Sequence, residues 1–154
     1  MGTILAFLML FAQEAAQVTH HAKGTFEVKV VPQKADNKPA EAANLGRMSI
    51  DKVFEGDLVG TSQGEMLSLM TETKGSGIYV AIERVNATLS GHQGSFVLHH
   101  TGIMARGVPQ LSVSVVPDSG TGQLAGLSGT FTIQIEGGKH FYGFDYVLPA
   151  EANH

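Results

Sequence analysis

Apolar and polar residues alternate along most of the chain from Gly24 onward, and Gly, Pro, Asn or Asp interrupts the alternation at short intervals. Alternation with a period of two is typical of strands that bury one face. The pattern predicts eight antiparallel strands, at residues 24–30, 48–57, 65–73, 77–89, 92–103, 110–116, 129–136 and 139–148. No segment shows a sustained apolar period of 3.6 residues, so no core helix is expected. We therefore predict an all-β protein that forms a single eight-stranded antiparallel barrel, with room inside for side chains or one small ligand.

The segments between these strands are rich in residues that favour turns. Tight turns are predicted at residues 74–77 (KGSG), 90–91 (SG) and 137–138 (GG). Residues 32–44 are polar and predict a loop. The strand at 77–89 is apolar on both faces, which predicts that it is covered on both sides.

Composition narrows the class of protein. A length of 154 residues fits one domain, and an apolar fraction of 43% excludes a disordered chain. The 10 Lys and Arg residues against 14 Asp and Glu give a net charge of -4, so no nucleic-acid partner is expected. The absence of cysteine excludes disulfides, iron–sulfur clusters, thiolate zinc sites and a cysteine nucleophile.

The first 17 residues differ from the rest because they contain the apolar run Thr3–Ala12 (TILAFLMLFA). This run is too short to span a bilayer, which takes about 20 residues, so no membrane span is expected. Its length suits a secretory signal peptide, although no Lys or Arg precedes it. Residues 1–17 are interpreted either as a signal peptide or as a segment that packs on the barrel or on a partner subunit, and residues 18–154 as the barrel domain. Cytoplasmic and periplasmic locations both stay open.

Two short motifs match known sites without the structural context that those sites need. Gly60-Thr-Ser62-Gln-Gly64 fits the G-x-S-x-G elbow of hydrolases, but the residues after it alternate like a strand, whereas the elbow leads into a helix. We interpret this motif as a hairpin turn. Gly120 to Ala125 fits G-x-G-x-x-A, again with no helix after it to hold a pyrophosphate. No cofactor is therefore expected.

The seven histidines raise the question of a metal site. His99 and His100 are adjacent in a predicted strand, so their side chains point to opposite faces of the sheet. No carboxylate stands at a spacing that completes a set of ligands. We predict no metal site.

Polar residues inside the apolar strands are the strongest candidates for function. Glu83 and Arg84 interrupt an apolar run and point to opposite faces, and burying either charge without a partner costs several kcal/mol. His100 shares a face with Phe96 and Leu98. Two interpretations remain: a buried polar network that fixes strand register, or a cavity with a few oriented polar groups. The predicted ligand-binding residues are Tyr79, Glu83, His100, Tyr142 and Tyr146, and Glu83 and His100 are the acid–base groups if the protein is an enzyme.

Five segments, in order, carry a resemblance to a known family. They are Gly24–Val28 (GTFEV), Phe54–Gly60 (FEGDLVG), Glu83–Val85 (ERV), Gly94–Gly102 (GSFVLHHTG) and Val116–Gly129 (VPDSGTGQLAGLSG). Over residues 22–148 they resemble a small bacterial family of unknown function whose members fold as an allene-oxide-cyclase-like barrel. The Gly120-Thr-Gly122 segment is also similar to a turn of allene oxide cyclases and dirigent proteins, in which two leucines plug the barrel end; here they would be Leu124 and Leu127. The resemblance implies an eight-stranded antiparallel barrel with an apolar cavity, in a group whose members are often oligomers.

Three functions are compatible with this barrel. The preferred prediction is a protein that binds a small apolar or amphipathic ligand in the barrel cavity. The first alternative is a cofactor-free isomerase or cyclase that uses a buried Glu or His as its acid–base group. The fold alone is weak evidence for such a reaction. The second is a structural barrel that acts through its outer surface or through a homo-oligomer interface.

Overall fold

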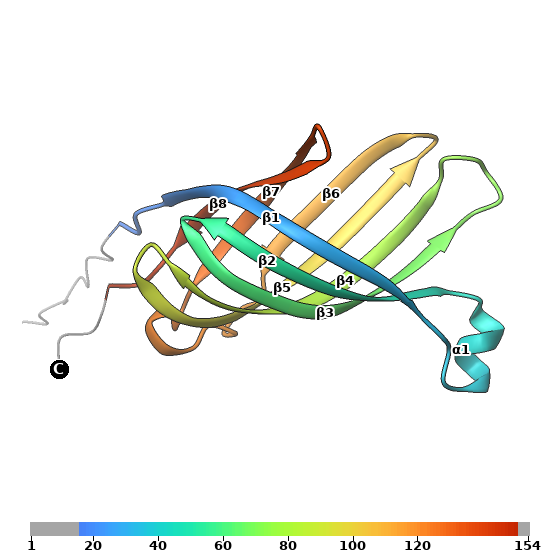
Figure 1. Ribbon diagram of the computed structural model, residues 1–154, viewed down its shortest axis with the longest axis horizontal. Helices are drawn as coiled ribbons and strands as arrows, with labels where there is room; N and C mark the ends of the chain where they lie inside the picture. The colour runs from blue at the N-terminus through green and yellow to red at the C-terminus, as the bar shows by residue number, and fades with distance from the viewer. Residues whose placement is uncertain (1–15, 151–154) are drawn as a thin grey trace, which may run out of the picture.

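The strands follow one another around a closed antiparallel barrel in chain order, and the last pairs with the first (Figure 1). The structure is a computed structural model and describes residues 16–150. The strands are β1 (His20–Gln33), β2 (Gly46–Gly56), β3 (Leu58–Met70), β4 (Gly77–Leu89), β5 (His92–Ala105), β6 (Val108–Val115), β7 (Ser128–Glu136) and β8 (Lys139–Val147). Helix α1 (Lys38–Ala43) and a short 3₁₀ helix, η1 (Gly122–Leu124), lie between strands. The predicted all-β class and the eight-stranded barrel are confirmed.

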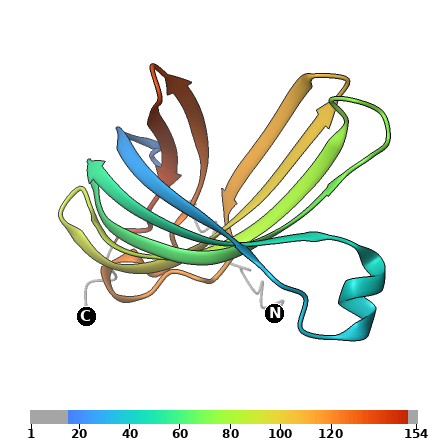
Figure 2. The same cartoon turned by 45° about the vertical axis from the view of Figure 1, so that its right-hand side comes forward.

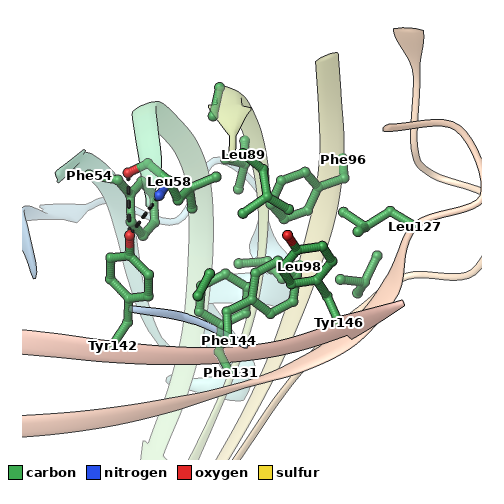
Figure 3. Packing of buried hydrophobic residues seen from close by; sticks show 14 of the residues in the cluster. Phe54, Leu58, Leu89, Phe96, Leu98, Leu127, Phe131, Tyr142, Phe144 and Tyr146 are labelled. Carbon is green, nitrogen blue, oxygen red and sulfur yellow. Dashed lines mark hydrogen bonds between the residues drawn. The ribbon is translucent and has the colours of Figure 1, made fainter. Parts of the chain in front are cut away.

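Inward-pointing aromatic and aliphatic side chains fill one end of the barrel (Figure 3). Phe131 and Phe144 stack with their ring centroids 4.0 Å apart. Leu124 and Leu127, from the turn after β6, are fully buried and close this end, as the resemblance implied. Gly122 adopts a positive φ of 59°, the left-handed region that favours glycine, which permits the tight reversal there.

The other end of the barrel is open because β6 and β7 are paired along only a short part of their length (Figure 2). Strand β6 pairs with β7 only at Val113–Phe131 and Ser114–Thr130. On the other side, β1 pairs with β8 from His20–Tyr146 to Phe26–His140. Beyond Phe131, β7 therefore has no neighbour on the side of β6, and inward-pointing side chains at this end reach solvent.

Strand β4 buries only one of its faces, so the prediction of a strand covered on both sides is wrong. Ala81, Glu83 and Val85 point into the barrel and are buried, whereas Val80 and Ile82 point outward and are exposed. The outer wall of a barrel lies against solvent unless another element covers it, and within residues 16–150 none covers β4. The apolar outer face therefore requires an explanation of its own.

Two other local predictions are corrected. The segment 32–44 is not entirely a loop, because β1 continues to Gln33 and α1 forms after Asn37, whose side chain accepts a hydrogen bond from the N–H of Ala40. The Gly60–Gly64 motif is not a hairpin turn, because it lies in the middle of β3 and pairs with both β2 and β4. The predicted turns at 74–77, 90–91 and 137–138 do connect neighbouring strands.

The expectations for the N-terminal segment stay predictions, since residues 1–15 lie outside the described part of the chain. The assignment of residues 18–154 as the barrel domain likewise remains a prediction. Within residues 16–150, no helix has the length and apolar character needed to cross a membrane.

Candidate functional site

Four polar side chains from four consecutive strands meet inside the barrel. Oε1 of Glu83 on β4 lies 2.7 Å from Nζ of Lys52 on β2 and 2.7 Å from Nε2 of His100 on β5. Oε2 of Glu83 accepts a hydrogen bond of 2.7 Å from the hydroxyl of Ser62 on β3. All four side chains are buried, and Glu83 is completely enclosed. We call these four residues the ionic cluster.

The cluster keeps Glu83 ionised. Burial by itself would raise the pKa of this carboxyl, but the hydrogen bond from His100 and the positive charge and hydrogen bond of Lys52 outweigh it and lower the pKa to about 2. Because the carboxylate accepts from Nε2, that nitrogen of His100 carries a proton. The ammonium of Lys52 also lies 5.0 Å from the ring centroid of Phe26, which adds a cation–π contact.

Glycine on β3 explains how the cluster assembles across three strands. Lys52 pairs with Ser62 on β3, and Glu83 pairs with Gly64 on the same strand. A Cβ on Gly64 would lie 2.7 Å from Cβ of Glu83 and would also overlap the carbonyl oxygen of Ile82. The absence of a side chain at position 64 therefore lets Glu83 occupy the space in which it reaches Lys52 over β3.

The second nitrogen of His100 is the part of the cluster that has no partner among the described residues. Nδ1 of His100 makes no hydrogen bond to the residues that the structure describes. It is not an enclosed atom either, since the only fully buried side-chain nitrogen or oxygen without a partner in residues 16–150 is Nδ1 of His92. Nδ1 of His100 therefore keeps unused hydrogen-bonding capacity, whereas both oxygens of Glu83 already have partners.

An apolar pocket of about 350 Å³ opens next to the cluster, toward the open end of the barrel. Inward-pointing side chains of β3, β4, β5 and β6 line it, among them Met66, Met70, Tyr79, Met104 and Leu111. Tyr79 stands four residues before Glu83 on the same face of β4, and burial together with the negative charge of Glu83 raises the pKa of its hydroxyl. Met66 pairs with Ala81, which pairs with His100, so the pocket adjoins the cluster.

Close packing at Gly102 sets the position of the Tyr79 ring. A Cβ on Gly102 would overlap this ring, so the aromatic face lies directly on the glycine backbone. No hydrogen bond joins the Tyr79 hydroxyl to another described residue. The hydroxyl is therefore a polar group that a ligand in the pocket can use.

The five residues predicted to bind ligand fall into two groups. Tyr79, Glu83 and His100 come together at the pocket and the cluster. Tyr142 lies in the packed core, where its hydroxyl accepts from the N–H of Leu58 at 2.9 Å (Figure 3). The same hydroxyl donates to the carbonyl of Glu55 at 3.1 Å. Tyr146 also belongs to the core.

Sequence reasoning missed two members of the cluster, Lys52 and Ser62. Lys52 follows the buried Ile50 and precedes the buried Phe54 at alternate positions, so the period-two pattern already places its charge inside. The interpretation of Gly60–Gly64 as a hairpin turn does not predict that the Ser62 side chain points into the barrel. The expectation that His99 and His100 point to opposite faces is confirmed, because His99 is exposed and His100 is buried.

Residues 16–150 hold no group of three or more His, Asp or Glu side chains placed to bind a metal ion. In the cluster, Glu83 and His100 are the two side chains of a type that binds metals. Lys52 already occupies one oxygen of Glu83 and Ser62 the other. The arrangement can thus hold a fixed carboxylate against an imidazole and present that imidazole to a small molecule.

The geometry defines a class of small antiparallel barrel proteins that have an apolar pocket at the open end and a buried ionic cluster beneath it. Within this class, the family model described as "Protein of unknown function (DUF3224)" matches residues 22–146, and the chain belongs to that family. The predicted membership of a family of unknown function is confirmed. The likeness to allene oxide cyclases stays a prediction.

A solved structure supports the same conclusion. It is the crystal structure of a protein of unknown function from the DUF3224 family of Shewanella oneidensis MR-1. The two chains are 50% identical and superpose with a TM-score of 0.79, over 86% of this chain and 99% of that one. Among curated proteins, no match was found.

Proposed function

We propose that the protein binds a small apolar or amphipathic molecule in the pocket between Met66, Tyr79 and Leu111. The observation that carries the proposal is an apolar pocket inside the barrel that is lined by Tyr79 and adjoins the ionic cluster at His100 through the strand register. A volume of about 350 Å³ is at the lower end of the range for small-molecule sites. Three methionines among the lining residues give a surface that adapts to ligands of different shape.

The ionic cluster supports this proposal as a rigid polar floor. Lys52, Ser62 and His100 all bond to Glu83, so β2, β3, β4 and β5 are held together just below the pocket. Nδ1 of His100 would accept a hydrogen bond from the polar part of a ligand and the Tyr79 hydroxyl would donate one, while the methionines would contact its apolar part.

A neutral apolar dye, N-phenyl-1-naphthylamine, tests the proposal. We expect its fluorescence to rise on binding and to fall when 1-decanol displaces it. Leu111→Arg places a charge in the pocket at a half-exposed position, and we expect it to weaken dye binding at least about tenfold. Val59→Arg, at an exposed position on the outer wall, is the matched control and should bind the dye like the wild type. Equal binding by both variants, or no binding by the wild type, would refute the proposal.

The pairing of His100 with Glu83 favours one second function, a cofactor-free isomerase or cyclase. Glu83 stays ionised at neutral pH and is enclosed, so in this function it would orient His100, and Nδ1 of His100 would exchange the proton. The test is exchange of α-hydrogens of a medium-chain ketone in D₂O, followed by NMR. Exchange that His100→Asn abolishes while dye binding persists would support catalysis, and absence of exchange by the wild type would exclude it for this substrate class.

A further inference from the structure

Six aliphatic side chains form a continuous patch on the outer wall of the barrel. They lie on three neighbouring strands, and their exposed fractions run from 41% at Ile78 to 65% at Ile82. They are Leu67 and Leu69 on β3, Ile78, Val80 and Ile82 on β4, and Ile103 on β5. We call them the outer patch.

Strand register makes the patch contiguous. Val80 pairs with Leu67, and Ile78 pairs with Leu69 on one side and Ile103 on the other. From the exposed fractions, the six side chains present on the order of 500 Å² of aliphatic surface, at the upper end of what a monomer leaves open. A surface of this size favours a partner that covers it.

Helix α1 projects from the barrel (Figure 2) and does not pack against it. None of its residues is buried, and a helix of six residues is marginal in water without tertiary packing. The cap at Asn37 and an ion pair of 3.3 Å between Asp36 and Arg47 fix its base. A groove lies between helix and wall, lined by Ala40, Val80 and Ile82 among others.

We propose that the outer patch binds the same patch of a second copy of this chain, around a two-fold axis that runs along β4. Such an axis places β3 of one copy over β5 of the other. Glu65 on β3 and His99 on β5 both pair with Ile82 and so stand at the same level on opposite sides of it. The axis therefore brings Glu65 of each copy opposite His99 of the other, and an imidazole N–H donates to a carboxylate in such a pair.

The size of the face suits a dimer. A standard interface buries about 800 Å² on each partner. The outer patch supplies the apolar centre, and the flanking polar positions Arg47, Glu65 and His99 supply a rim. In the dimer, α1 of each copy closes over the edge of the other, which provides the packing that the helix lacks within one chain.

The full chain in analytical ultracentrifugation tests the dimer. We expect the wild type to sediment as a dimer at micromolar concentration. Ile82→Lys puts a charge at the centre of the patch and should raise the dimer dissociation constant about 100-fold, as loss of a central contact in both copies does. Val59→Lys changes another exposed aliphatic residue of the outer wall, outside the patch, and should leave the dimer intact. A wild type that stays monomeric, or an Ile82→Lys variant that still dimerises like the wild type, overturns the proposal.

Crosslinking through an introduced cysteine tests the position of the axis. Because the chain has no cysteine of its own, only the introduced residue can react. On a two-fold axis along β4, residue 82 of one copy lies near residue 82 of the other. A short bis-maleimide should therefore link Ile82→Cys into covalent dimers and leave Val59→Cys monomeric. Crosslinking of both variants to the same extent would show that the contact is not specific to this face and would overturn the proposal. Circular dichroism of each variant confirms that the barrel is folded.

Discussion

Nζ of Lys52 lies 2.7 Å from Oε1 of Glu83, although a whole strand separates the two residues in the sheet. The ion pair therefore connects β2 to β4 across β3, where Ser62 donates to the same carboxylate. A slip of one residue in the pairing of β4 would turn Glu83 to the outer wall and leave Lys52 buried without a counter-charge. The pair thus favours a single register for three strands of the barrel.

Removing the charge of Glu83 should destabilise the fold. Glu83→Gln leaves the ammonium of Lys52 buried and uncompensated, so we expect the free energy of unfolding to fall by about 3 kcal/mol. The double variant Lys52→Met/Glu83→Gln should recover at least half of this loss, because no buried charge then remains without a partner. Urea denaturation followed by circular dichroism measures both effects. Asp145→Asn removes the charge of the exposed partner of His21 and should cost no more than about 0.5 kcal/mol; a similar cost for Glu83→Gln would contradict the prediction.

Acid should weaken the barrel through the same carboxyl. Its folded-state pKa of about 2 lies below the ordinary value of 4.5, so the stabilisation is complete above about pH 5 and is lost as the pH falls toward 2. The lost free energy should be about 3 kcal/mol, and Glu83→Gln should lack this part of the acid dependence. Unfolding free energies of the two proteins between pH 6 and pH 2 measure the difference. Parallel curves for both proteins would mean that Glu83 does not control the acid response.

The hydroxyl of Tyr142 should contribute to stability rather than to ligand binding. Tyr142→Phe leaves the N–H of Leu58 without its partner inside the barrel, which we expect to cost about 1–2 kcal/mol. Tyr146→Phe is the control, because no hydrogen bond joins the Tyr146 hydroxyl to another described residue. Its cost should be smaller, and dye binding should be unchanged in both variants. Weaker dye binding by Tyr142→Phe at full stability would place this hydroxyl at the ligand instead.

An added methyl group at position 64 should disturb the cluster. In Gly64→Ala the new Cβ meets the backbone and Cβ of Glu83, neither of which can move away without breaking the β3–β4 pairing. We expect a loss of about 2 kcal/mol or more in the free energy of unfolding. Gly143→Ala is the matched control, since its Cβ would meet only the hydroxyl of Thr132, which can rotate. Equal stability of the two variants in thermal denaturation would contradict this account.

The number and order of the strands could be predicted from the sequence because alternation and turn residues are local properties. Which face of β4 points inward could not, since Ile78, Val80 and Ile82 make the outer face as apolar as the inner one. A strand face that contacts a partner and one that packs in the core have the same hydrophobic pattern in the sequence. The two faces of β4 can be told apart only once the barrel is assembled.

The candidate site was predictable in part for a related reason. Glu83 and His100 stand out because each interrupts an apolar strand, and the structure places them in contact. The role of Tyr142 depends on a hydrogen bond to Leu58, 84 positions away in the chain, which no local pattern contains. Lys52 could have been found from its alternate position between Ile50 and Phe54.

The short pairing between β6 and β7 leaves unpaired strand edges, to which strands of other molecules could add as in a fibril. Beyond Val113 and Phe131, both strands have an edge that is not paired across the seam, and such edges can recruit strands from other molecules. Pro109 on β6 lacks the N–H that an added strand would need, and Glu136 and Lys139 place charges at the tip of the β7–β8 hairpin. These three residues act as gatekeepers, which allows the barrel to keep an open mouth without becoming a template for aggregation.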